Sequence, residues 1–283
     1  MAANTANLHD PASALDLTNI RTSLQRMEDS IIFSLIERSQ YKANLAVYNP
    51  DCSQLGPFKL HQLKSAGSNG CLGDWFIYQT ECLHSQVRRY QHPTEFSFFD
   101  PLPEPTLGST SGARTDRERI LHEVPKAAQV NQQLLDIYRS KVVPALCEDG
   151  DDGNHGSTAV QDVHVLQTIS TRIYYGLFVA ESKFRTETEK ATALIKARDR
   201  DGLMAFITKT DVELKNIQRV ILKARTFAQN IAGGEEGQLA PAPSKDTTYK
   251  INPEFVGAVF RDYIMPLTKE VEVEYLLERL SSQ

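Results

Sequence analysis

The sequence has no long apolar run, no block of basic residues and only four cysteines in 283 residues. A membrane-spanning helix needs about 20 apolar residues in a row, so we expect no membrane partner. The formal net charge of −5 is spread along the chain, which argues against nucleic acid as the main partner. Cys52, Cys71, Cys82 and Cys147 form no CxxC pair, so we expect reduced thiols in a cytoplasmic protein.

The usual signatures of catalysis and metal binding are also missing. There is no GxGxxG after a strand, no P-loop, no HExxH and no GxSxG. The seven histidines never occur at the spacing of paired metal ligands. The run DGDDGNHG resembles part of a calcium loop but lacks the full ligand register and the terminal glutamate. We therefore expect no metal and no cofactor.

The chain is long for one domain but within range, and it contains no tandem repeat. We expect a single domain over residues 1–283, because no segment is left for a second catalytic domain. Residues 1–14 lack the basic start and apolar centre of a secretory signal, which disfavours a secreted protein. We expect residues 1–14 to be flexible and residues 233–248, rich in glycine and proline, to form an exposed loop.

Apolar residues recur at spacings of three and four over most of the chain, which indicates amphipathic helices. No convincing strand pair is present, so we predict an all-α fold. Asp74 and either Ser157 or Thr158 are predicted helix caps. The predicted helices span about 16–42, 75–91, 116–147 with breaks at Pro125 and Pro144, 158–185, 188–198, 202–230, and 253–280 with a kink or restart at Pro266.

The stretch Ala159–Arg185, AVQDVHVLQTISTRIYYGLFVAESKFR, contains no proline, and we expect the rest of the chain to be organised around it as a helix. Arg172 and Lys183 interrupt its apolar face at nearly the same angle, about 16 Å apart along the axis. Two long cationic side chains so placed could hold one small anion. The alternative is that both are surface cations whose stems lie on apolar neighbours.

Other charged and polar residues stand on apolar helices: Arg21, Glu213, Thr268 and Glu272. Thr268 and Glu272 are four apart and share a helix face. Together with Arg172 and Lys183, these groups offer cations for carboxylates, a hydroxyl and carboxyl groups whose pKa can be tuned. Such a set suits a reaction that needs positioning and electrostatics without a nucleophile.

Three segments resemble the fungal and plant chorismate mutases. They are LDLTNIRTSLQRMEDSIIFSLIERSQY, GSTAVQDVHVLQTISTRIYYGLFVAESKF and MPLTKEVEVEYLLERL, which occur in the family's order. The resemblance implies an all-helical homodimer with an active site inside each subunit. It also implies the rearrangement of chorismate to prephenate, a step toward phenylalanine and tyrosine, without a cofactor.

The resemblance also implies a role for each candidate residue. Arg21 and Arg172 match carboxylate-binding arginines, and Lys183 matches the lysine that donates to the ether oxygen. Glu213 matches the glutamate near the substrate hydroxyl, and Thr268 a threonine near the ring carboxylate. Glu272 matches a glutamate that donates to the ether oxygen when protonated, which requires a raised pKa.

Fungal members are typically inhibited by tyrosine and activated by tryptophan at the dimer interface. Residues matching that effector site are Arg88, Arg89, Asn154, Gly156 and Ser157.

Two positions depart from the family pattern. Val160 stands where a threonine is expected, and Asn252 replaces a threonine before a proline. Asparagine caps a helix as well as threonine does.

A competing interpretation is a helical interaction protein derived from a mutase that has lost its activity. That interpretation predicts substitutions among the catalytic candidates, and the sequence has none there.

Overall fold

The computed structural model describes residues 10–52, 55, 70–106, 120–230 and 247–281. Within them there is no strand, only an isolated bridge between Gln229 and Tyr249, so the all-α prediction is confirmed. The helices are α1 (Pro11–Ala14), α2 (Leu17–Arg38), η1 (Leu45–Tyr48), α3 (Leu72–Gln86), η3 (Arg89–Gln91), η4 (Lys126–Ala128), α5 (Asn131–Ile137), η5 (Tyr138–Val142), α6 (Val143–Leu146), α7 (His155–Tyr174), α8 (Gly176–Thr186), α9 (Thr188–Lys196), α10 (Arg200–Ile207), α11 (Thr210–Phe227), α12 (Pro253–Val259), η6 (Phe260–Ile264) and α13 (Met265–Glu278).

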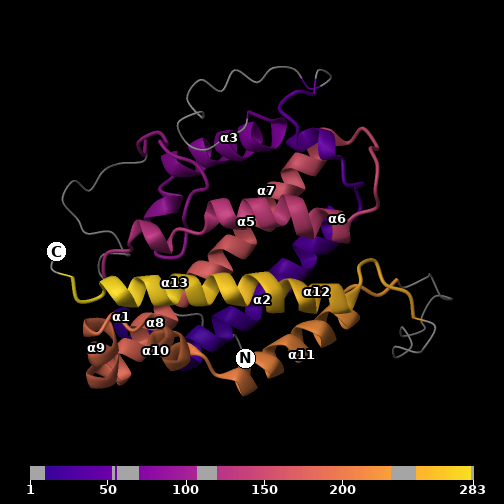
Figure 1. Ribbon diagram of the computed structural model, residues 1–283. Coiled ribbons are helices and arrows are strands. Elements are labelled where there is room, and N and C mark those ends of the chain that lie inside the picture. Colours follow the sequence, from indigo (N-terminus) through magenta and orange to yellow (C-terminus); the bar gives the residue numbers. More distant parts are fainter. Residues whose placement is uncertain (1–9, 53–54, 56–69, 107–119, 231–246, 282–283) are drawn as a thin grey trace.

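Helices α12, η6 and α13 form one long rod, and α2 and α7 cross it (Figure 1). Helix α2 packs along α7, α13 packs along α8, and α11 packs against α12 and α2. The apolar faces of these helices form one buried core, in which Ile31, Leu35, Leu166, Ile173 and Val271 are at most 1% exposed. These are the positions that the three-and-four spacing selects.

Helix α2 ends at Arg38, four residues before the predicted end. The fully buried guanidinium of Arg38 donates to the carbonyls of Tyr41, Lys42 and Ala43, so the chain folds back around it. Arg38 also pairs with buried Asp162 on α7, with Nε and Oδ1 2.7 Å apart. The end of α2 is therefore set by a contact with a residue far away in the sequence.

Two predicted helix caps are wrong. Helix α3 is capped by Cys71, whose sulfur accepts from the N–H of Asp74, while the Asp74 carboxylate pairs with Arg139. Helix α3 also ends at Gln86, and the short helix η3 follows it. Helix α7 starts at His155, so Ser157 and Thr158 lie within its first turn. The hydroxyl of Thr158 instead accepts from the side chain of Asn44.

Prolines 144 and 266 do not break their helices. Each stands at the second position of an α-helix that directly follows a π-helical segment, η5 or η6. Proline lacks the N–H of an ordinary helical turn, and the wider π turn before it lets the helix continue. The break at Pro125 is confirmed, since residues 121–130 contain only the short helix η4.

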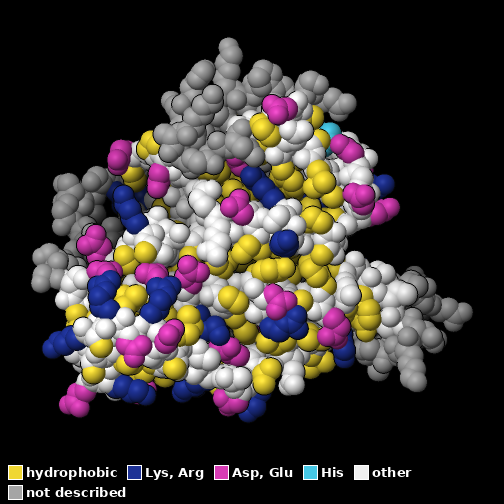
Figure 2. Space-filling view, in the orientation of Figure 1, with side chains coloured by type: hydrophobic (Ala, Val, Ile, Leu, Met, Phe, Trp, Pro, Cys, Tyr) yellow, Lys and Arg dark blue, Asp and Glu magenta, His cyan; other side chains and the backbone are white. Residues whose placement is uncertain are grey.

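Among the described residues, no helix combines the length and the apolar character that crossing a membrane requires. On the face shown in Figure 2, basic and acidic side chains are interspersed, and apolar side chains lie exposed between them. Pro11–Ala14 form α1, whereas residues 1–9 and most of the predicted loop at 233–248 lie outside the described residues.

Candidate active site

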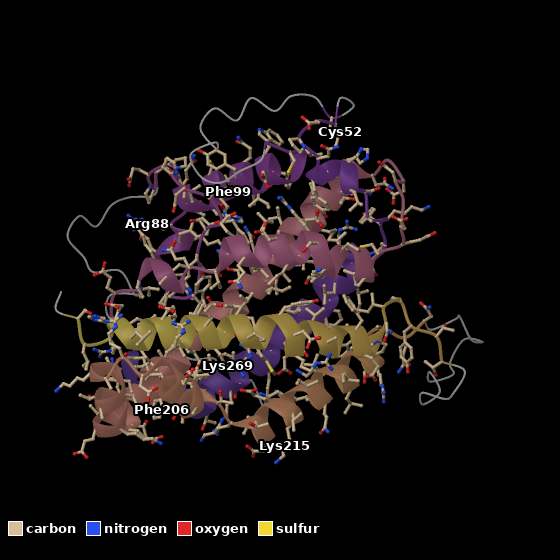
Figure 3. The ribbon with its side chains drawn as sticks, viewed as in Figure 1. Cys52, Arg88, Phe99, Phe206, Lys215 and Lys269 are labelled. Atoms are coloured by element: carbon tan, nitrogen blue, oxygen red, sulfur yellow. The ribbon has the colours of Figure 1, made fainter. Side chains whose placement is uncertain are left out.

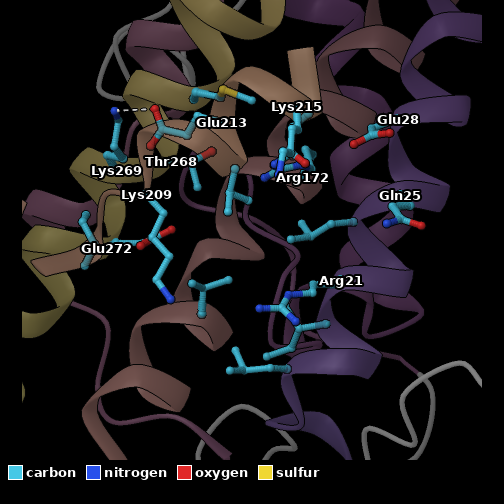
Figure 4. Close-up of a pocket in the computed structure, with 18 of the residues that line it drawn as sticks. Arg21, Gln25, Glu28, Arg172, Lys209, Glu213, Lys215, Thr268, Lys269 and Glu272 are labelled. Atoms are coloured by element: carbon cyan, nitrogen blue, oxygen red, sulfur yellow. Dashed lines mark hydrogen bonds and ion pairs between the residues drawn. The ribbon is translucent and has the colours of Figure 1, made fainter. Parts of the chain in front are cut away.

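A pocket of about 370 Å³ lies between α2, the α7–α8 junction, α11 and α13 (Figure 4). All six catalytic candidates line it: Arg21, Arg172, Lys183, Glu213, Thr268 and Glu272. They come from five helices, and the first and the last of them are 251 residues apart in the sequence. The volume lies within the range of small-molecule sites in proteins.

The lining is strongly cationic. Seven lysine or arginine side chains line the pocket, against the three carboxyl groups of Glu28, Glu213 and Glu272. Two of these carboxyl groups already have partners: Glu28 pairs with Arg219 at 2.6 Å and Glu213 pairs with Lys269 at 3.2 Å. Several cations are therefore left for an anionic ligand.

Arg172 is the most unusual of these cations. It is 7% exposed, and its guanidinium makes no hydrogen bond to any residue that the structure describes. Burial lowers the pKa of Arg172, and the charges of Glu28 and Glu272 partly oppose that shift. A buried guanidinium without an acceptor is costly unless a ligand supplies one. This arrangement is that of an anion site.

Lys183 is held by the end of a neighbouring helix. Its ammonium donates to the carbonyls of Phe206 and Ile207, the last two residues of α10. Carbonyls in the last turn of a helix lack intrahelical partners, which makes them good acceptors for a cation. Two of the three N–H groups are thus engaged, and one is left to donate to a ligand. Burial lowers the pKa of Lys183.

The contact between Lys183 and the last carbonyls of α10 lies where the predicted helix at 202–230 divides into two helices. The chain leaves helical geometry at Thr208 and Lys209, between α10 and α11. The predicted helix at 158–185 is likewise divided at Tyr175 into α7 and α8. Arg172 and Lys183 therefore stand on different helices, although both line the pocket.

Glu272, on α13, also lines the pocket. It is 6% exposed, and burial raises its pKa to about 8 against the opposing charges of Lys183 and Arg172. At neutral pH the carboxyl group is therefore mostly protonated and able to donate. Gly176, the first residue of α8, permits this approach: a Cβ there would lie 2.8 Å from Thr268 Cγ2 and 3.1 Å from Glu272 Cγ. A larger residue would require the side chains of Thr268 and Glu272, or α13 itself, to move.

Some residues of the pocket were not predicted from the sequence. Glu28, 3% exposed, bridges α2 to α11 through Arg219 and Lys223. A signal for Glu28 was available, because it stands seven residues after Arg21 and so shares its helix face. No local pattern indicated Arg219, Lys209 or Lys269, since only the packing of α10 to α13 brings them to the pocket.

The five predicted effector residues form two separate groups. Arg89, after α3, donates to Gln167 on α7, to His84 and to Glu95. Its neighbour in the sequence, Arg88, is labelled in Figure 3. Asn154 and Gly156 stand at the start of α7, about 16 to 20 Å of helix before Gln167. Within one chain the structure does not bring the two groups together.

The two groups differ in exposure: Asn154, Gly156 and Ser157 are exposed, whereas Arg88 and Arg89 are half-buried. Arg88 has a left-handed backbone (φ 65°), and its buried Nε has no hydrogen-bond partner among the described residues. Asn154 is the N-cap position of α7 but makes no capping bond, and a Cβ on Gly156 would meet nothing within 4 Å. Ser157 is exposed. Asn252 caps α12 by accepting from the N–H groups of Glu254 and Phe255, as its sequence predicts.

Comparison with known proteins of similar sequence and structure identifies the family of this chain. No protein-family model matches the chain. The chain is 42% identical to the chloroplastic chorismate mutase 1 of Petunia hybrida, over 97% of this chain and 79% of the relative. A crystal structure of a Candida albicans chorismate mutase in complex with L-Trp superposes with a TM-score of 0.80, at 33% identity over 98% of this chain and 96% of that one.

A crystal structure of the protein called AtCM1, with tyrosine bound in its allosteric site, superposes with a TM-score of 0.74. It is 40% identical, over 96% of this chain and 99% of that one. Identity at this level over nearly the whole chain is accompanied by the same fold. The chain belongs to the chorismate mutase family of plants and fungi.

Proposed function

We propose that this protein catalyses the rearrangement of chorismate to prephenate at the pocket between α2 and α13. The observation that carries the proposal is the buried Arg172 without a hydrogen-bond acceptor, beside Lys183 and the protonated Glu272. Chorismate is a dianion, and a pocket with unpaired cations suits it. Its rearrangement breaks an ether C–O bond and forms a C–C bond, so no nucleophile or electron carrier is needed.

Electrostatic stabilisation of the ether oxygen is the proposed source of rate. Negative charge grows on that oxygen as the C–O bond breaks, and donors aimed at it act more strongly in the transition state than in the ground state. In our proposal Lys183 and the protonated Glu272 are these donors. Both are held in place, Lys183 by the last carbonyls of α10 and Glu272 by the close contact with Gly176.

The remaining candidates bind and orient the substrate. Arg172 and Arg21 take the two carboxylates, for which the planar guanidinium is well suited. Glu213, held by Lys269 at 3.2 Å, faces the substrate hydroxyl. The hydroxyl of Thr268 donates to the carbonyl of Ile264 in this structure, and in our proposal it turns to donate to the ring carboxylate of the bound substrate. These roles position a reactive conformer, which alone can account for a large part of the rate.

The test is the conversion of chorismate to prephenate by the purified protein and two variants. Arg172→Gln removes the buried guanidinium, and we expect kcat/KM to fall about 100-fold or more. Arg261→Gln is the matched control, because Arg261 is exposed and pairs only with its neighbour Asp262. The interaction-protein alternative instead predicts folded wild-type protein without turnover. Equal activity of both variants would also contradict the proposal.

We further propose a homodimer in which tyrosine and tryptophan bind between subunits. Arg88 and Arg89 on one chain lie too far from Asn154 and Gly156 of the same chain to hold one amino acid. Apolar surface lies close to both groups in the sequence: Leu83 on α3, Val87 directly after α3 and Val160 on α7 are exposed by 63%, 52% and 48%. A second copy that covered them could bring the start of its α7 to Arg88 and Arg89.

Sedimentation and activity measurements test this arrangement. We expect a dimer whose turnover is lowered by tyrosine and raised by tryptophan, and an Arg89→Ala variant that responds to neither. The N-terminus of α7 suits an amino acid's carboxylate, because the first N–H groups of an α-helix have no partner within the helix. A monomer that responds to both effectors would refute the shared site.

We also propose that the chain is one catalytic domain working in the cytoplasm. The four cysteines are free within the structure, which suits a reducing compartment. Recovery of the protein in the cytosolic fraction of its cells is the expected result, and recovery in an organelle or in the medium would refute it.

A further inference from the structure

The junction of α10 and α11 brings one more cation to the pocket, Lys209, which has no role assigned above. Figure 4 shows Lys209 and Arg21 reaching into the pocket from opposite sides, the first from the junction and the second from α2. Both residues are exposed, so they stand at the mouth, whereas Arg172 and Glu272 lie deep. The pocket therefore has cations at two depths.

The backbone of Lys209 is fixed although its side chain is not. Its carbonyl accepts hydrogen bonds from the N–H groups of Val212 and Glu213, each at 3.0 Å, and Lys209 is the N-cap residue of α11. Two residues earlier, the carbonyl of Ile207 accepts from Lys183. A residue anchored between two such contacts has a defined point from which its side chain starts.

The ammonium of Lys209 has no partner of its own. It makes no hydrogen bond or ion pair with any residue in the described part of the chain. The pocket offers no spare carboxylate, since Glu28 and Glu213 are paired and Glu272 is mostly protonated. Lys209 is close enough to act within the site: after burial, its charge is a further cause of the lowered pKa of Lys183.

We propose that Lys209 is a substrate-binding residue whose ammonium pairs with the chorismate carboxylate that Arg21 also binds. The inference rests on the proposed function and adds a third cation to its recognition of the dianion. An exposed pair at the mouth forms equally in the ground state and the transition state. Such uniform binding lowers KM and leaves kcat unchanged. It also steers a dianion into the pocket, an effect that salt weakens.

The test compares four proteins: wild type, Lys209→Gln, Lys209→Arg and Lys196→Gln. Lys196 is the matched control, an exposed lysine in the last turn of nearby α9 that does not line the pocket. For each protein kcat and KM for chorismate are measured at about 20 mM and about 200 mM salt, where screening lengths differ about threefold.

We expect Lys209→Gln to raise KM about 3- to 5-fold at low salt, with kcat within about twofold of wild type. The difference should shrink at high salt, Lys209→Arg should restore KM, and Lys196→Gln should match wild type. A KM for Lys209→Gln no different from that of Lys196→Gln would overturn the inference, as would a loss in kcat alone. Wild-type protein without turnover would refute the proposed function instead, so the two failures are distinguishable.

Discussion

Replacing Glu272 with glutamine gives the sharpest test of how the pocket works. Burial raises the pKa of Glu272 to about 8, far above that of a free carboxyl group. In the proposed reaction the protonated carboxyl group of Glu272 donates to the ether oxygen. Activity is therefore highest at low pH and is lost as the pH rises through the pKa of Glu272. With a pKa of about 8, about 90% of the groups are protonated at pH 7 and about 10% at pH 9. Because this pKa belongs to the ligand-free protein, wild-type kcat/KM should fall about tenfold over that interval.

Glutamine keeps an N–H donor at the same place but cannot ionise. The Glu272→Gln variant should lose the step near pH 8 and keep a flat rate to higher pH. Any later decline then belongs to Lys183, whose pKa burial also lowers. The assay is prephenate formation from pH 6 to pH 10 in a buffer of constant ionic strength. A variant with the wild-type profile would show that another group controls the rate.

Stability should respond to the same substitution, in a way that does not depend on catalysis. A carboxyl group with a raised folded pKa binds more protons in the folded state than in the unfolded state. The free energy of unfolding therefore falls as pH rises between about 4.5 and 8, by about 1.4 kcal/mol per pH unit for each such group. Burial also raises the pKa of Glu81, on α3, to about 8. Glu272→Gln should thus make the slope measured by denaturant unfolding shallower and leave the part that belongs to Glu81.

Substitutions at three further positions test the packing and capping of the fold. Gly176→Ala places a Cβ 2.8 Å from Thr268 Cγ2. The free energy of unfolding in urea should therefore fall by about 1–3 kcal/mol, and kcat should fall with it. Unchanged values of both would contradict the close packing. Asp162→Asn leaves the fully buried Arg38 without its anion, which should cost about 3–5 kcal/mol; a loss below about 1 kcal/mol would mean that the pair is not needed. Asn252→Ala removes a helix cap and should cost about 1 kcal/mol, whereas Asn252→Thr should be nearly neutral; equal losses would refute a capping role.

The helical class and the main helices could be read from the sequence, because the spacing of apolar residues depends only on local geometry. Helix ends could not be read so well. Arg38 ends α2 by pairing with Asp162, which is 124 residues away. The break between α10 and α11 lies beside two carbonyls that hold Lys183, and no local pattern signals that contact.

The π turns before Pro144 and Pro266 are another case. The sequence predicts a break at Pro144 and a kink or restart at Pro266. Only the packing on both sides of each proline shows that the helix continues through a π turn.

The candidate site divides in the same way. The spacing of Arg172 and Lys183 indicated an anion site, and charged or polar residues on apolar helices gave the other four candidates. The resemblance to a family supplied the role of each. The structure adds what neither could give: the missing acceptor of Arg172, the contact of Gly176 with Glu272 and the position of Lys209. Each is a relation between helices that are distant in the sequence.

The most direct test of the account is the rate of prephenate formation by the purified wild-type chain and by Lys183→Met, at pH 7. The side chain of methionine has nearly the length of lysine but cannot donate to the ether oxygen. We predict turnover by the wild type and a rate lower by about 100-fold or more in the variant, with both proteins folded. Folded wild-type protein without turnover, or a variant as fast as the wild type, would contradict the account.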